Sequence, residues 1–275
     1  MSGGERGHLV VRVARSALAA IFFTGFAAGS VLLGFLLFPV LLLMGRGEGG
    51  RRRMRSCVRG SYRFFVWAAR VTGLFRVDVA EDDLSVLSEA SGKVVVANHI
   101  SLIDVIILMS FLPDSTAVAK SAAGRNPFYS RIVSSAFIVN DDPERVLASA
   151  AELLSSGVDI LIFPEGTRTR PGAARRLHRG AAQVALHSGA GVMCVLMSSD
   201  PPVLGKGQPW WDVGGRTIRY RLEVRGEIVP QPLRSGEPSH AAAVSLTREI
   251  ERRLWPDASG GLSKGPACRG THAEP

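Results

Sequence analysis

The sequence predicts an α/β fold, a domain with a mixed central sheet flanked by helices and preceded by an N-terminal membrane segment. From about residue 74 onward, runs of β-branched residues alternate with helical patterns, as in a sheet whose strands are joined by helices. The continuous apolar runs VVVA (94–97) and ILIF (160–163) predict central strands that are covered on both faces. Upstream, no charged residue occurs from Ala17 to Met44, which predicts a membrane segment.

This membrane segment, residues 17–44, follows a basic N-terminal segment of residues 1–16. As a straight helix it would be about 42 Å long, more than the roughly 30 Å hydrocarbon core requires. We therefore expect it to tilt strongly or to break, and the sequence offers break points at Gly25, Gly29, Gly34 and Pro39. Arginines flank it on both sides, with more after it than before it. The positive-inside rule then predicts a cell-membrane protein whose domain lies on the cytoplasmic face, and both a single span and a re-entrant hairpin fit.

Residues 45–75 are expected to form a basic linker and an interfacial helix. The linker contains Arg46, Arg51, Arg52, Arg53 and Arg55. Within 58–75, further arginines recur at near-helical spacing among aromatic residues, which suits a helix in the headgroup region of anionic lipids. An amphipathic helix that packs on its own domain would show the same pattern, so the sequence leaves both interpretations open.

The domain itself is expected to span residues 76–256. The predicted strands are Phe75–Val79, Lys93–Ala97, Thr116–Lys120, Ala136–Asn140, Asp159–Phe163, Gly191–Met197 and Thr217–Val229. The predicted helices are Ser101–Phe111, Asn126–Ser134, Pro143–Ser156, His178–His187 and Ser239–Leu254. The composition then turns to Gly, Ser, Pro and Lys, which predicts a disordered tail over residues 257–275.

Composition and charge narrow the class of partner. The chain has 275 residues, is 46% hydrophobic and carries a net charge of +9, which favours an anionic partner. No nucleic-acid-binding motif accompanies this charge, so anionic membrane lipids are the expected partner. The cysteines, Cys57, Cys194 and Cys268, show no metal-ligand spacing and are expected to be free thiols. We expect no metal site.

The first stretch that could carry chemistry is VVVANHISLID, residues 94–104. On one ideal helix, His99 and Asp104 would point about 140° apart. They can meet if His99 lies on the turn that leaves the strand and Asp104 lies in the first turns of the next helix. A carboxylate there would fix the imidazole tautomer and stabilise the imidazolium, while the other ring nitrogen accepts a hydroxyl proton.

The second stretch is LIFPEGTRTRPG, residues 161–172, where an apolar strand runs directly into a polar loop. Gly166 allows close approach of a ligand, Arg168 can bind an anion, and Glu165 can accept hydrogen bonds. This set of residues suits a phosphorylated ligand. A surface turn with solvated charges is the alternative.

Together, and in this order about sixty residues apart, NHISLID and FPEGTR resemble motifs I and III of the glycerolipid acyltransferase family. These are the lysophosphatidic-acid-acyltransferase-like enzymes, with the signature N-H-x4-D and F-P-E-G-T-R. The resemblance covers residues 93 to about 200 and extends more loosely to about 230. It implies a single acyltransferase domain that moves a fatty acyl chain to the hydroxyl of a lysophospholipid, with 1-acyl-sn-glycerol-3-phosphate as the expected acceptor and phosphatidic acid as the product.

The resemblance also implies roles for individual residues. His99 would be the general base that deprotonates the acceptor hydroxyl, and Asp104 would orient it. The remaining family positions are expected to bind the acceptor, partly through its phosphate: Glu165, Gly166, Thr167, Arg168, Lys120 and Arg131. Acyl-CoA or acyl carrier protein would be the cosubstrate, and neither a cofactor nor a covalent acyl-enzyme is implied.

The chain departs from the family pattern at motif II. The matching stretch is SSAFIVNDDPE, in which Asn140, Asp141 and Asp142 stand where the basic residue that contacts glycerol phosphate is expected. Two neighbouring acids would repel a phosphate, which leaves a different lipid or glycolipid acceptor open. A catalytically silent membrane-binding scaffold is the third interpretation, and the presence of His99, Asp104, Glu165 and Arg168 argues against it.

Overall fold

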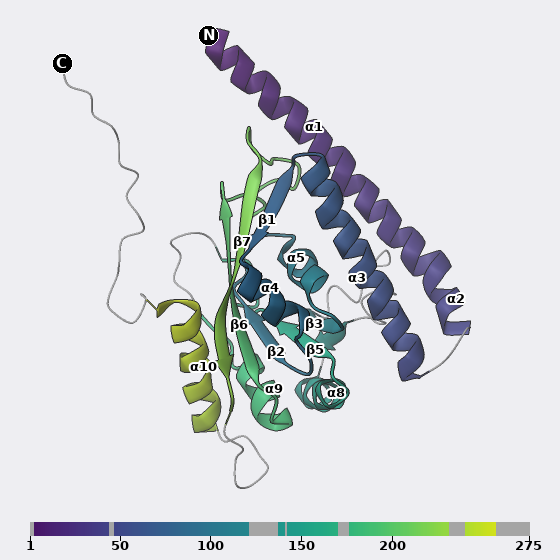
Figure 1. The fold of residues 1–275 in the computed structure, drawn as a ribbon, viewed down its shortest axis with the longest axis vertical. Coiled ribbons are helices and arrows are strands. Elements are labelled where there is room, and N and C mark those ends of the chain that lie inside the picture. The colour runs from purple at the N-terminus through teal and green to yellow at the C-terminus, as the bar shows by residue number, and fades with distance from the viewer. Residues whose placement is uncertain are drawn as a thin grey trace, which may run out of the picture.

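The computed structural model describes residues 3–43, 47–120, 137–140, 142–169, 176–230 and 240–256. A seven-stranded mixed sheet lies at its centre, with the strand order β1-β7-β6-β2-β5-β3-β4 (Figure 1). All neighbouring strands are parallel except β6 and β7, which are antiparallel. The strands are β1 (Phe75–Val79), β2 (Val94–Ala97), β3 (Ser115–Lys120), β4 (Ile138–Asn140), β5 (Asp159–Ile162), β6 (Val192–Asp200) and β7 (Ile218–Ile228).

Helices cover both faces of the sheet and bury a separate apolar cluster on each. One face packs against α3 (Glu48–Val71), α4 (Glu81–Ser88) and α5 (Asp104–Phe111). The other face packs against α8 (Pro143–Ser155), α9 (Gly180–Ser188) and α10 (His240–Leu254). The central strands β2 and β5 are buried along their whole lengths, which confirms that the VVVA and ILIF runs are strands covered on both sides.

The mixed α/β architecture confirms the predicted fold class, and the predicted strands agree with the seven strands to within a few residues. Two details differ. The first predicted helix begins at Asp104 rather than Ser101, because residues 100–103 form the turn that holds His99. Helix α4 was not predicted, since eight residues are too short to show a clear helical period. The predicted helix Asn126–Ser134 and the predicted tail, residues 257–275, lie outside the described residues.

The N-terminal segment is helical and changes its winding where glycine and proline occur. Helix α1 (Gly3–Leu32) passes into a π-helical turn (Leu33–Leu37) and then into α2 (Phe38–Leu43). The turn contains Gly34 and precedes Pro39, two of the predicted break points. Among the described residues, Gly7–Leu41 is the one helical stretch with the length and composition of a membrane span.

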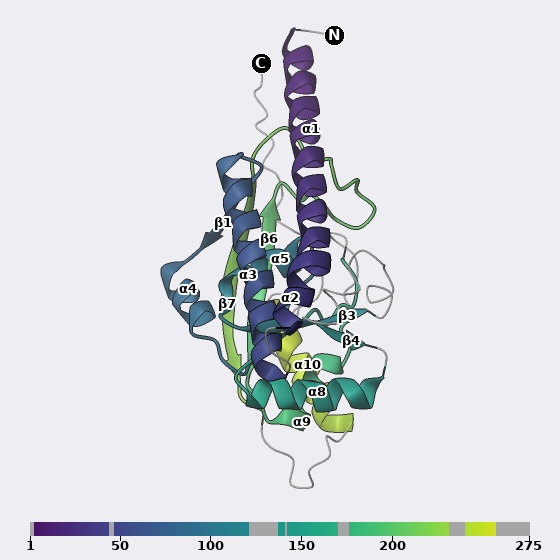
Figure 2. The same ribbon diagram turned by 90° about the vertical axis from the view of Figure 1, so that its right-hand side faces the viewer.

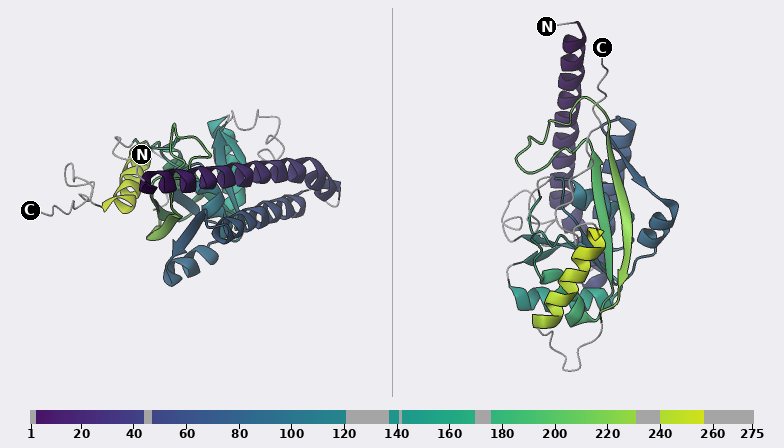
Figure 3. Two further views of the ribbon diagram at one scale, coloured as in Figure 1. Left: turned by 90° about the horizontal axis from the view of Figure 1, so that it is seen from above. Right: turned by 90° about the vertical axis from the view of Figure 1, so that its left-hand side faces the viewer.

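Helices α1 and α3 lie side by side as an antiparallel hairpin along one edge of the molecule (Figures 1 and 2). Phe22, Phe23 and Phe26 of α1 pack on Phe65 of α3, with ring centroids 4.5–5.8 Å apart. Seen from above, α1 runs across the domain beside α3 (Figure 3, left).

Helix α3 packs on its own domain, as one of the two interpretations expected. Its buried face, which includes Phe65 and Ala69, packs on the domain. Its other face exposes Phe64 and Trp67, whose side chains are 62% and 58% accessible.

The linker arginines include one that cannot contact lipid. Arg55 is only 5% exposed and forms ion pairs with Asp114 and Glu48, so its expected place in a lipid-facing cluster is wrong. The half-buried Asp114 and the exposed Glu48 compensate its charge, and the pair with Asp114 joins α3 to the turn before β3.

Candidate active site

The predicted general base, His99, lies in the turn that leaves the carboxyl end of the central strand β2. Asn98, just before it, is buried and joins this turn to β6. Its amide nitrogen donates to the Met197 carbonyl at 2.8 Å, and its amide oxygen accepts from the Met197 N–H at 2.6 Å. These two bonds fix the chain direction at the point where the His99 side chain leaves the sheet.

Asp104 meets His99 in the way that the spacing predicted. Its Oδ2 lies 2.8 Å from His99 Nδ1, and its side chain is completely buried at the start of α5. The same oxygen accepts from the backbone N–H groups of Ile100 at 2.7 Å and Ser101 at 2.8 Å. The Ser101 hydroxyl donates to the other carboxylate oxygen. Four donors therefore converge on one buried carboxylate, which compensates the cost of burying its charge and locks the turn.

The imidazole of His99 is held on its second side by Phe163, which follows β5. The two rings stack with centroids 4.5 Å apart and an interplanar angle of 27°. Among the described residues, no hydrogen bond involves Nε2 of His99, and 19% of its side chain is accessible. With Nδ1 on a carboxylate, Nε2 is the nitrogen that can accept a proton.

The FPEGTR loop lies directly against this turn. Glu165 is 6% exposed, and its Oε1 accepts the backbone N–H of His99 at 2.9 Å. Its other oxygen, Oε2, has no hydrogen-bond partner among the described residues. The Thr169 N–H donates to the His99 carbonyl at 3.0 Å, so both ends of the loop are tied to the same residue. The structure thus brings the two sequence motifs together.

Gly166 has a conformation and surroundings that require glycine. Its φ is +64°, and a Cβ at this position would lie 3.1 Å from the His178 ring. Any larger residue would be strained in both respects. Thr167 follows on the exposed surface of the loop.

Arg168 shows a contact that the sequence did not predict. Its Nη1 donates to the carbonyls of Leu204 at 2.9 Å and Gly205 at 3.1 Å, in the segment that follows β6. The Leu204 carbonyl also accepts the backbone N–H of Leu102 from the His99 turn. One part of the guanidinium therefore holds this segment in place, and the half-buried side chain can still offer its other N–H groups to an anion.

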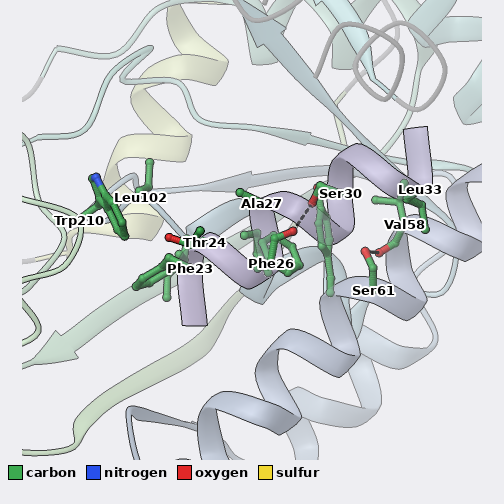
Figure 4. A pocket seen from close by; sticks show the side chains of 13 residues that line it. Phe23, Thr24, Phe26, Ala27, Ser30, Leu33, Val58, Ser61, Leu102 and Trp210 are labelled. Atoms are coloured by element: carbon green, nitrogen blue, oxygen red, sulfur yellow. Dashed lines mark hydrogen bonds between the residues drawn. The ribbon is translucent and has the colours of Figure 1, made fainter. Parts of the chain in front are cut away.

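An apolar cavity of about 520 Å³ opens beside the His99 turn. Figure 4 shows its lining, with Trp210 and Leu102 at one end and Leu33 and Val58 at the other. Phe23 and Phe26 of α1 lie between them. Ile103, next to Asp104 in the sequence, also lines it. The cavity is thus enclosed by the N-terminal hairpin on one side and by the NHISLID stretch on the other.

The other predicted residues are not all brought to this site. Lys120 ends β3, but its side chain is outside the described part of the chain, as is Arg131 altogether. In motif II, Asn140 is exposed at the end of β4, and Asp142 caps α8 by accepting the Glu144 N–H at 3.0 Å. The capping carboxylate therefore has a structural explanation. Within the described residues, no cluster of three or more metal-ligand side chains occurs.

Comparison with known proteins gives the same class. Residues 76–198 match the family model for the Acyltransferase domain. A 1-acyl-sn-glycerol-3-phosphate acyltransferase of Pseudomonas aeruginosa is 27% identical over 218 residues, covering 77% of each chain. The Borreliella burgdorferi enzyme of that name is 28% identical over 52% of this chain and 56% of its own. The crystal structure of the Thermotoga maritima 1-acyl-sn-glycerophosphate acyltransferase PlsC has the same fold, with a TM-score of 0.60, 19% identity, and coverage of 92% of this chain and 100% of that one.

The family match and the named relatives identify residues 76–198 as an acyltransferase domain, and the sheet has the fold of the PlsC structure. Within that class, the chain is similar to the lysophosphatidic-acid-acyltransferase-like enzymes, as the two motifs indicated.

Proposed function

We propose that the protein is a membrane-bound O-acyltransferase that acylates 1-acyl-sn-glycerol-3-phosphate to give phosphatidic acid, with acyl-CoA or acyl carrier protein as the donor. The observation that carries the proposal is the His99–Asp104 pair at the carboxyl end of β2, 2.8 Å apart and bordered by an apolar cavity. Curated relatives bearing the name of this activity support the choice of acceptor.

In this mechanism, His99 Nε2 takes the proton of the acceptor hydroxyl as the hydroxyl oxygen attacks the thioester carbonyl carbon. The buried Asp104 carboxylate stabilises the imidazolium that forms. The tetrahedral intermediate then collapses, the carbon–sulfur bond breaks, and the imidazolium returns its proton to the departing thiolate. The products are an oxygen ester and a free thiol, and His99 is regenerated.

Arg168 would bind the acceptor phosphate. Gly166 and Thr167 would allow the phosphate to come close to the loop. Nη1 of Arg168 is engaged by two backbone carbonyls, so the phosphate would meet the remaining N–H groups. Glu165 would act through the His99 backbone and through its unpartnered Oε2, which can accept from a hydroxyl of the acceptor. Lys120 and Arg131 remain proposed phosphate contacts.

The apolar cavity supports a lipid substrate. Its volume of about 520 Å³ lies within the range of about 300–1,000 Å³ of small-molecule sites, and its lining is mostly aliphatic and aromatic. A fatty acyl chain placed there would leave its carbonyl or glycerol end at Leu102 and Ile103, beside the His99–Asp104 pair.

The contacts of α1 support a segment that lies along the domain rather than a single span. The re-entrant interpretation expected residues 17–44 to turn back on themselves, but residues 17–43 are helical and continue in one direction, and the chain reverses only between α2 and α3 (Figure 1). Near the amino end of α1, Arg12 pairs with Asp212 at 2.6 Å. Arg15 donates to four backbone carbonyls of the domain, those of Gly73, Leu74, Gly214 and Arg216. Helix α1 is therefore bound to the domain from Arg12 to Phe26, while its amino end projects beyond the domain (Figure 1). We infer that a helix held along this length lies on the domain rather than crossing a bilayer away from it. We place the α1–α3 hairpin within the cytoplasmic leaflet, with its exposed apolar side chains in lipid: Leu9, Val10, Val13, Ile21, Leu32, Phe35, Leu36, Phe64 and Trp67.

A different lipid acceptor is the second candidate. The observation in its favour is Asn140 at the exposed end of β4, where the family pattern has a basic residue for glycerol phosphate. An acceptor without that phosphate would not require a cation there.

The first test is acyl transfer from a labelled acyl-CoA to 1-acyl-sn-glycerol-3-phosphate, with the wild type beside His99→Ala. We expect the variant to lose at least about 10²–10⁴-fold in rate and to bind vesicles as the wild type does. Near-normal activity in the variant would refute the mechanism. A wild type that is inactive with this acceptor but active with other lysolipids would favour the second candidate.

A further inference from the structure

At the end of the sheet where the candidate active site lies, one face carries exposed arginines that no helix of the described residues covers. Helix α10 lies across this face only farther down (Figure 3, right). On β7, Ile218, Tyr220 and Leu222 are buried in the cluster on the α3 side, so the residues that alternate with them face the other side. In this uncovered part, Arg76 of β1 lies opposite Arg219 of β7, and Arg221 follows two residues along β7. All three arginines are exposed. Arg216, just before β7, is exposed as well. We call these four residues the basic face: Arg76, Arg216, Arg219 and Arg221.

The charges of this face are not explained by folding. Like charges directly opposite on neighbouring strands destabilise a sheet, and Arg76 and Arg219 are such a pair. The nearest acids on the same surface are Asp78, beside Arg221, and Asp200, beside Arg219. Glu223 follows on the same face of β7 and is paired with Arg225 at 2.8 Å. Asp200 is paired with Arg216 at 2.5 Å. Among the described residues, no ion pair involves Arg76, Arg219 or Arg221, so the basic face retains a positive excess.

The basic face is close to the reacting residues. Met197, which bonds to Asn98, lies three residues before Asp200, and Asp200 lies opposite Arg219. At about 3.3 Å per residue and about 4.8 Å per strand, Arg219 is about 10 Å beyond Asn98 along the sheet and about 10 Å to the side. A long flexible thioester arm anchored on this face would reach the His99 turn.

The orientation of the face excludes the membrane as its partner. The exposed apolar residues of α1 and α3 lie on the opposite face of the sheet, so a lipid surface that binds the hairpin cannot also meet Arg219 and Arg221. The surface is also open and made of neighbouring strands, whereas small ligands bind in clefts. Its positive charge, spread over neighbouring strands, fits a soluble acidic protein.

We propose that the basic face is the docking surface for an acidic carrier protein that delivers the acyl group as a thioester. This inference rests on the proposed acyl transfer and assigns its donor: the carrier protein binds on the face of the sheet opposite the membrane, and the lipid acceptor enters from the hairpin side. Donor and acceptor then approach His99 from opposite faces.

The test compares two donors with the same acyl chain, acyl carrier protein and acyl-CoA, in the wild type, Arg219→Glu, Arg221→Glu and the double variant. Arg145→Glu on α8, which changes the net charge equally at an exposed site, is the matched control. We expect the KM for the carrier protein to rise about tenfold or more in the double variant, while the KM for acyl-CoA changes less than about twofold. Arg219→Lys should restore most of the affinity.

Binding of holo-acyl carrier protein without any acyl group, measured by titration calorimetry, separates docking from catalysis. Weaker binding in the double variant and normal binding in Arg145→Glu would support the proposal, even if the wild type proved inactive with the expected acceptor. Equal losses with both donors, a loss with acyl-CoA alone, or unchanged carrier-protein binding would each overturn it. Transfer from neither donor to any lysolipid by a wild type that binds the carrier protein would instead refute the proposed function.

Discussion

Replacing Asp104 with asparagine removes one charge from the active site and leaves its shape intact. The asparagine oxygen can take the place of Oδ2, where it still accepts from His99 Nδ1, Ile100 N–H and Ser101 N–H. The new amide group then meets the Ser101 hydroxyl, which can accept a hydrogen bond as well as donate one. We therefore expect a change of only about 1 kcal/mol in the free energy of unfolding.

The catalytic effect should be much larger. During transfer the imidazolium of His99 carries a positive charge about 4 Å from the charge centre of the carboxylate, and at an effective dielectric constant of about 20 this attraction is about 4 kcal/mol. Since 1.36 kcal/mol corresponds to one factor of ten in rate, the loss of the charge should lower kcat about 10³-fold.

The assay is steady-state transfer from acyl-CoA to 1-acyl-sn-glycerol-3-phosphate, together with thermal unfolding of each protein. Asp82→Asn, an exposed change on α4, controls for the loss of a carboxylate. A folded Asp104→Asn protein that retains more than a tenth of the wild-type kcat would show that the carboxylate does not stabilise the imidazolium.

Three further changes test other parts of the structure. Arg168→Ala should raise the KM of the acceptor more than that of the donor, because the phosphate loses its guanidinium; the opposite pattern in the kinetics would assign the anion site to the donor. Ser30→Phe, which fills part of the cavity, should shift the preference toward shorter acyl chains in a donor series, and an unchanged profile would exclude the cavity as the chain site. Asp159→Asn should raise the melting temperature more at pH 8 than at pH 4.5. Burial raises the pKa of Asp159 to about 7, so the unfolded chain ionises first, and the native state loses stability as the pH rises from about 4 to about 7. The difference should be on the order of 3 kcal/mol, and a gain that does not depend on pH would contradict this assignment.

The sequence predicted those features of the fold and the site that depend on residues close together in the chain. The spacing of His99 and Asp104 across a strand-to-helix turn predicted their contact, and the apolar runs predicted the central strands. Both depend on short-range geometry, which a single sequence contains. The position of motif III beside motif I followed only from the family resemblance, since it requires β2 and β5 to be neighbours.

Contacts between distant parts of the chain were not predictable in the same way. Arg168 and Arg15 bind backbone carbonyls, and since every residue has one, the sequence does not indicate which carbonyls are bound. Arg55 has the same appearance in the sequence as its exposed neighbours, and its burial depends on Asp114, 59 residues away. The cavity likewise forms only when the hairpin packs on the domain.

The clamp that Arg15 forms has a practical consequence for protein production. A shortened chain that lacks α1 would expose the Phe65 surface and the apolar cavity to water. The carbonyls of Gly73 and Leu74 would each lose one of their two donors. The N-terminal helix is therefore an integral part of the domain rather than a detachable anchor. The full chain, rather than one shortened at the hydrophobic segment, should give a homogeneous sample.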